Sequence, residues 1–81
     1  MRLFSSLKPN NMYKVAEEIS KAVLRAKEKH PEFAANEDRA LILLIEEVGE
    51  AAQALNDNDK AKARAEILDA IAVCVRYLET F

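Results

Sequence analysis

Four acidic residues at helical spacing are the residues of this sequence best suited to chemistry. Glu47 and Glu50 are three positions apart, and after fifteen intervening residues Glu66 and Asp69 repeat that spacing. On an α-helix, residues three apart lie on one face, so each pair would present two carboxylates to one neighbour. Carboxylate oxygens suit Mg²⁺, with Mn²⁺ as an alternative, better than zinc. The four residues are therefore candidate metal ligands.

Two carboxylate pairs that converge cannot all stay ionised without compensation. Two like charges about 4 Å apart repel by roughly 4 kcal/mol at an effective dielectric constant near 20. Such groups must take up protons, pair with cations or bind a metal. Because Asp and Glu make up 14 of the 81 residues, such pairs also arise by chance in helices. A structural role, with Lys or Arg pairing to the acids across an interface, is the alternative.

The first helix is predicted to begin near Asn10 or Asn11, either of which can cap it, and to end at about Lys29 before Pro31. Residues 1–10 are expected to form an irregular lead-in. One apolar stripe follows the spacing of three and four: Met12, Val15, Ala16, Ile19, Ala22, Val23 and Ala26. The opposite face is expected to be solvated and holds Lys14, Glu17, Glu18, Lys21, Arg25 and Glu28.

Two further helices complete the predicted fold. The second is expected from a cap at Asn36 to about Asn56, and the third from a cap at Asp57 or Asn58 almost to Phe81. The connections are short, which favours antiparallel neighbours. The sequence thus predicts one all-α domain over residues 1–81, an antiparallel bundle of three main helices completed by self-association.

Each of the last two helices has a principal apolar stripe, expected to face the core. These stripes are Leu41, Leu44, Ile45, Val48, Ala52 and Leu55 on the second helix, and Ile67, Ile71, Cys74, Val75 and Leu78 on the third. The acidic pairs lie on a neighbouring face, together with Val73 and Tyr77 on the third helix. Because Val73 and Tyr77 are poorly suited to water, that face is expected to be buried as well.

Gly49 interrupts the second helix at a cost of about 1 kcal/mol relative to Ala. It would allow the close approach of a helix or ligand, or it is simply tolerated in packing.

The composition limits the classes of protein and partner. Apolar residues make up 51% of the chain, more than three short helices can bury, so a homodimer or homotetramer is expected. The sequence has no basic stripe with interleaved aromatic residues, so binding to a nucleic-acid polymer is not expected. The single Cys74 fits a reducing compartment. Because the sequence also shows no signal-peptide core and no membrane-spanning run, a cytoplasmic location and no membrane partner are expected.

The acidic pairs and their surroundings resemble a known family. The string Leu44-Ile45-Glu46-Glu47-Val48-Gly49-Glu50-Ala51-Ala52, followed by Glu66-Ile67-Leu68-Asp69, resembles the MazG-like all-α nucleotide pyrophosphohydrolases. Their signature is E-x-x-E on one helix and E-x-x-D on the next. The segment from Glu47 to Glu50 is also similar to the related dCTP pyrophosphatases. The resemblance covers residues 36–80.

This resemblance implies a Mg²⁺-dependent enzyme that hydrolyses a nucleoside triphosphate to the monophosphate and pyrophosphate, as in the housecleaning of nucleotide pools. It implies that Glu47, Glu50, Glu66 and Asp69 hold the metal and act in catalysis through it. It gives Glu46 a supporting role. It also implies a homodimer or homotetramer whose sites lie within the shared bundle.

The chain departs from the family in the residues that would hold phosphate and base. Family members carry Lys, Arg and Asn residues after the E-x-x-D helix, whereas only Arg76 follows Asp69 here. Other candidates for phosphate, each equally suited to a solvated surface, are Arg39, Lys60, Lys62 and Arg64. The aromatic residues that could stack on a base, or pack in the core, are Tyr13, Phe33 and Tyr77. His30 is expected to interact with the dipole at a helix end.

These departures keep a second hypothesis open. In it, the chain is a non-catalytic relative that binds metal or nucleotide without turnover, or a structural helical oligomer.

Overall fold

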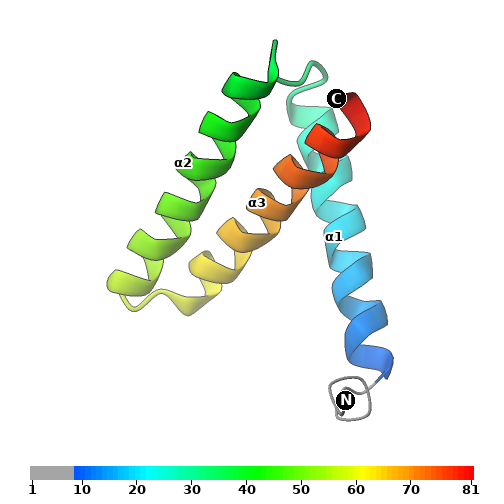
Figure 1. Cartoon of the computed structure of the whole chain (residues 1–81). Coiled ribbons are helices and arrows are strands. Elements are labelled where there is room, and N and C mark those ends of the chain that lie inside the picture. Colours follow the sequence, from blue (N-terminus) through cyan, green and yellow to red (C-terminus); the bar gives the residue numbers. More distant parts are fainter. Residues whose placement is uncertain (1–8) are drawn as a thin grey trace, which may run out of the picture.

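The computed structural model describes residues 9–81 and consists of three α-helices joined by two short connections (Figure 1). They are α1 (Pro9–Lys29), α2 (Glu37–Asn56) and α3 (Lys60–Thr80), and no strand occurs among the described residues. The predicted all-α class is therefore confirmed. The expected lead-in falls largely on residues 1–8, which lie outside the described residues. Asn10 already belongs to α1, so this helix begins before its predicted caps.

The start of α2 is the one predicted from its capping residue. The side-chain oxygen of Asn36 accepts a hydrogen bond of 2.9 Å from the backbone N–H of Arg39. Glu37 and Asp38 occupy the first turn, where the positive end of the helix dipole favours acidic side chains.

The cap of α3 differs from the predicted one. Asp59, rather than Asp57 or Asn58, accepts a hydrogen bond of 3.0 Å from the backbone N–H of Lys62. Asp57 still belongs to the end of α2, since its N–H donates to carbonyl groups of the last turn. Asn58 has a φ of 59°, a left-handed conformation that asparagine tolerates well. Asp57 and Asn58 therefore both belong to the turn, and Asp59 caps α3.

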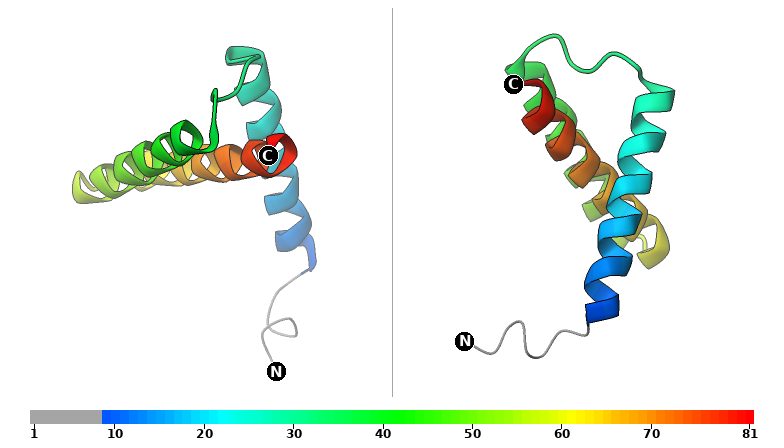
Figure 2. Two further views of the ribbon diagram at one scale, coloured as in Figure 1. Left: turned by 45° about the horizontal axis from the view of Figure 1, so that its top comes forward. Right: turned by 90° about the vertical axis from the view of Figure 1, so that its right-hand side faces the viewer.

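Helix α3 is the central element of the fold. It forms an antiparallel hairpin with α2 and packs on another side against α1, which crosses it obliquely (Figures 1 and 2). Helices α1 and α2 do not pack against each other. The three helices thus form an open arrangement, in which α3 alone contacts both neighbours.

The contact between α1 and α3 uses the later part of the predicted stripe of the first helix, whereas its first members, Met12 and Val15, are exposed. Ala22 and Val23 of α1 are buried together with Ala72 of α3. Around them pack the partly buried side chains of Ile19, Ala26, Leu68 and Val75. Arg25, on the opposite face, is exposed as predicted.

The interface between α2 and α3 lies on the face that carries the acidic pairs and not on the principal stripes. Its buried residues are alanines, namely Ala40, Ala51, Ala54, Ala63 and Ala70. Small side chains let the two helix backbones approach closely. The face of α2 that carries Glu47 and Ala54 therefore turns toward α3, and the expectation that the principal stripes form the core of this chain is wrong.

Much of each principal stripe is exposed instead. Ile45 is 69% exposed and Leu78 78%, and Cys74, expected in the core, is exposed as well. Other exposed members of these stripes are Leu41, Val48, Leu55 and Ile67. An apolar groove of about 250 Å³ lies between the two helices on this side and is lined by Leu41, Leu44 and Leu78 among others. We refer to the exposed stripe residues and this groove as the apolar face.

Gly49 has no close neighbour among residues 9–81. A Cβ atom at this position would meet no atom within 4 Å among the described residues.

Within residues 9–81, no helix combines the length and apolar character needed to cross a lipid bilayer.

Candidate metal centre and adjoining cavity

Three of the four predicted ligands come together between α2 and α3. Carboxylate oxygens of Glu47, Glu66 and Asp69 all lie within 4.8 Å of one another. The alanine interface positions them, because Ala51 and Ala70 sit about one turn from Glu47 and Glu66 and hold the helices close. Glu47 and Glu66 are half-buried, and Asp69 is exposed.

The cluster changes the acidity of its members. Burial raises the pKa of Glu47 to about 7, and a shared hydrogen bond with Glu66 and the charges of Glu50 and Asp69 act in the same direction. Partial burial also raises the pKa of Asp69, and the Glu66 charge raises it further. Each group therefore holds its proton more tightly than in water, as expected where anions are crowded. A cation would relieve this crowding.

Glu50 and Glu46 stand beside the cluster. Glu50 is not among the three residues whose oxygens converge, but a hydrogen bond and the negative charge of Glu66 raise its pKa. Glu46 is exposed and lines the wall of the adjoining cavity on α2. Of the predicted set, the structure brings three residues into one group and leaves two at its edge.

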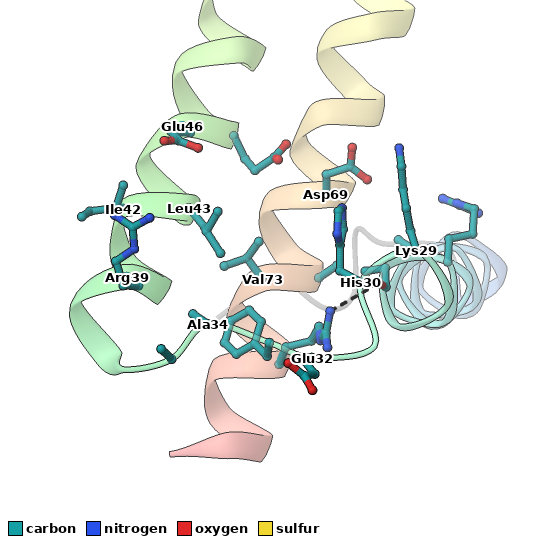
Figure 3. A pocket seen from close by; sticks show the side chains of 18 residues that line it. Lys29, His30, Glu32, Ala34, Arg39, Ile42, Leu43, Glu46, Asp69 and Val73 are labelled. Atoms are coloured by element: carbon teal, nitrogen blue, oxygen red, sulfur yellow. Dashed lines mark hydrogen bonds between the residues drawn. The ribbon is translucent and has the colours of Figure 1, made fainter.

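The cluster opens into a cavity of about 740 Å³ between α1, α2, α3 and the segment that follows α1. Its wall includes the acids Glu47 and Asp69 and basic side chains from α1. Figure 3 shows Lys29 and His30 on the α1 side near Asp69, with Arg39 and Glu46 across the cavity on α2. A volume of this size is typical of small-molecule sites.

Two cavity residues were missed by the sequence analysis. Arg25 was assigned to the solvated face of the first helix, and Lys29 was treated only as its end. Both line the cavity, and the positive charge of each lowers the pKa of Asp69 against the effects of burial and Glu66. The signal that could have found them is their spacing of four residues, which puts them on one face of α1.

The residues predicted to contact phosphate lie in different surroundings. Arg39 lines the cavity, whereas Arg64 is paired with Glu18 of α1 through two hydrogen bonds. Lys62 lies close enough to Glu50 for its charge to lower the pKa of that carboxyl. No described contact bears on a role for Lys60.

Arg76 has an unexpected position for a charged residue. It is only 7% exposed and lines the cavity. Its guanidinium donates to the backbone carbonyls of Ala26 at 3.3 Å and Pro31 at 3.4 Å, and it lies 4.9 Å from the ring centroid of Phe33. Arg76 therefore ties α3 to the end of α1 and the segment after it.

One of the predicted stacking residues, Phe33, lines the cavity. Its ring also packs near Phe81, with ring centroids 6.3 Å apart, and the ring centroid of Tyr77 lies 5.4 Å from that of Phe81. The Tyr77 hydroxyl donates to Glu37. Tyr13 is exposed on α1 and does not line the cavity, whereas His30 does.

None of the four predicted ligands is neutralised by an ion pair within the described part of the chain. The ion pairs there are Lys21 with Glu17, Lys27 with Glu79 and Arg64 with Glu18. The structural alternative places the pairing Lys or Arg across an interface with another chain, so it stays a prediction.

Comparisons with known proteins add no relative to this description. No protein-family model matches the chain, and no curated protein or solved structure matches it either.

Proposed function

We propose that this protein is a Mg²⁺-dependent nucleoside triphosphate pyrophosphohydrolase of the MazG-like kind. The observation that supports this proposal is the convergence of Glu47, Glu66 and Asp69 from two helices, at the positions that the family resemblance assigns to metal ligands. The products would be a nucleoside monophosphate and pyrophosphate, and a housecleaning role would fit this activity.

The dimensions of the cluster suit one divalent cation. Mg²⁺ binds carboxylate oxygens, and three such oxygens within 4.8 Å of one another would converge on one ion after side-chain movement. When bound, the ion would neutralise phosphate charge and activate water for attack on phosphorus. Mn²⁺ has the same ligand preference and is the alternative cofactor.

The carboxylates are proposed to have different roles in metal binding and catalysis, according to their positions. Glu47, Glu66 and Asp69 would hold the ion, and Glu50, beside Glu66, would complete the ligand set after a change of side-chain conformation. Glu46, on the cavity wall, is placed to orient water or a ribose hydroxyl as the supporting acid.

A second chain is proposed to cover the apolar face. Exposed Ile45 and Leu78 and the groove lined by Leu41 and Leu44 would be buried against the same residues of a second copy. A two-fold contact of this kind needs only one self-complementary surface. The resulting homodimer or homotetramer would act in the cytoplasm.

The test is pyrophosphate release from a panel of ribo- and deoxyribonucleoside triphosphates, with and without Mg²⁺. We expect release from at least one nucleotide with Mg²⁺, and loss of that activity in Asp69→Asn. Glu28→Asn is the control, because Glu28 is an exposed acid of α1 outside the cavity. A purified protein that binds Mg²⁺ but releases no pyrophosphate from any nucleotide would refute the proposal.

The non-catalytic alternative draws on the position of Glu50, which lies outside the converging group. Calorimetry that shows Mg²⁺-dependent nucleotide binding without product would select it.

A further inference from the structure

Arg25 and Lys29 form a pair of basic side chains on the cavity side of α1. They are four residues apart, so they lie one above the other on the helix. Neither forms an ion pair within 4 Å among the described residues, whereas their neighbours Lys21 and Lys27 pair with Glu17 and Glu79. The two cations that face the cavity are therefore available to an anion from solution.

Arg76 adds a third positive charge to this region. Its guanidinium is nearly inaccessible to solvent, and the hydrogen bonds described for it go to neutral carbonyl oxygens rather than to a carboxylate. No described acidic side chain lies within ion-pair distance of it. A buried charge without a counter-ion is unfavourable, so an anion in the cavity would improve its environment.

The cavity thus brings acidic and basic side chains together. Glu47 and Asp69 line it from α2 and α3, and Arg25 and Lys29 line it from α1, close enough for both to affect Asp69. A cation alone or an anion alone would match only one part. A polyphosphate chain that carries a divalent cation matches both, because it combines a metal with negative charges a few ångströms away.

We propose that Arg25 and Lys29 bind the terminal phosphates of a metal-bound polyphosphate chain, while the acidic cluster holds the metal. For a nucleoside triphosphate, this inference rests on the proposed function, in which the terminal phosphates leave as pyrophosphate. Both side chains are positioning and binding residues, which hold the chain by charge-assisted hydrogen bonds. Arg25 is suited to two parallel bonds with one phosphate, and Lys29 acts as a point charge.

The experiment measures binding of inorganic tripolyphosphate in the presence of Mg²⁺, by calorimetry, to the full chain and to Arg25→Gln and Lys29→Gln. Each substitution is expected to weaken binding about tenfold, the effect of losing one charge-assisted contact. Affinity for Mg²⁺ alone should not fall, since each change removes a positive charge near Asp69. Lys14→Gln, an exposed lysine of α1 outside the cavity, is the matched control and should bind as the unchanged protein does.

The same variants are then tested with the nucleotide that is hydrolysed best. A similar loss for nucleotide and tripolyphosphate shows that the contact is with the phosphate chain. If no nucleotide is hydrolysed but tripolyphosphate binding depends on Arg25 and Lys29, the proposed function fails and this inference stands. The inference is overturned if tripolyphosphate does not bind, if both variants bind it normally, or if Lys14→Gln loses as much affinity.

Discussion

Carboxylate oxygens of Glu47 on α2 and Asp69 on α3 lie within 4.8 Å of each other, although the two residues belong to different helices. This distance results from the alanine interface, which brings the backbones close while leaving the longer acidic side chains at its edge. The raised pKa values of both groups show that the arrangement disfavours ionisation. The acidic cluster is thus unfavourable for the metal-free fold at neutral pH and favourable for a cation.

Mg²⁺ is expected to raise the melting temperature of the unchanged protein. A ligand that binds only the folded state at ten times its dissociation constant adds about 1.4 kcal/mol, or roughly 5–10 °C for a domain of this size. Asp69→Asn should remove most of this rise, because it removes one charged ligand. Calorimetric or fluorescence melting with and without Mg²⁺ measures the effect. No rise in the unchanged protein at tens of millimolar Mg²⁺ would contradict a metal site.

Stability of the metal-free protein is expected to fall as the pH rises. The folded-state pKa of Glu47 is about 7, above the ordinary value of 4.5, so the folded state holds a proton that the unfolded state has lost. The contribution is fully present below about pH 4.5 and disappears as the pH passes about 7. Glu50 and Asp69 act in the same direction. Urea unfolding at several pH values measures this dependence.

Glu47→Gln tests the origin of that pH dependence. The variant should unfold at a higher urea concentration than the unchanged protein above pH 7, and its stability should depend less on pH. Glu28→Gln, an exposed acid of α1, should leave the dependence unchanged. Equal pH profiles for the unchanged protein and Glu47→Gln would show that the cluster is not the cause.

The apolar face is expected to hold chains together. Ile45→Lys or Leu78→Lys should shift the protein toward the monomer, because burial of one such side chain contributes about 1.5–3 kcal/mol. Leu24→Lys is the control, since Leu24 is 59% exposed but lies on α1, away from this face. Analytical ultracentrifugation measures the state of each protein. If the unchanged chain is monomeric at tens of micromolar, a second copy does not cover this face.

Arg76 is expected to stabilise the fold despite its charge. Arg76→Met should cost about 1–3 kcal/mol of unfolding free energy, because it leaves the carbonyls of Ala26 and Pro31 without these donors. Arg64→Met provides the comparison, since its bonds to Glu18 are exposed and screened by solvent, and it should change stability little. Similar urea midpoints for both variants would mean that burial of Arg76 does not matter to stability.

Local signals predicted much of this structure. Helix periods and caps predicted three helices and the start of α2 at Asn36, because a cap depends on residues only a few positions apart. The same local information was insufficient at the turn before α3. There the left-handed conformation of Asn58 moved the cap to Asp59, and several Asn and Asp residues in a row were equally suited to it.

By itself, the sequence determined that the chain is helical and that each acidic pair shares a helix face, since both follow from the helical period. Tertiary structure alone decided that α3 meets the alanine side of α2, that Glu50 lies at the edge of the cluster, and that Arg25 and Lys29 of α1 lie near Asp69. The physical reason is that periodicity defines the faces of a helix but not the neighbour that each face meets. Among faces of similar apolar character, that choice depends on how closely two backbones can approach.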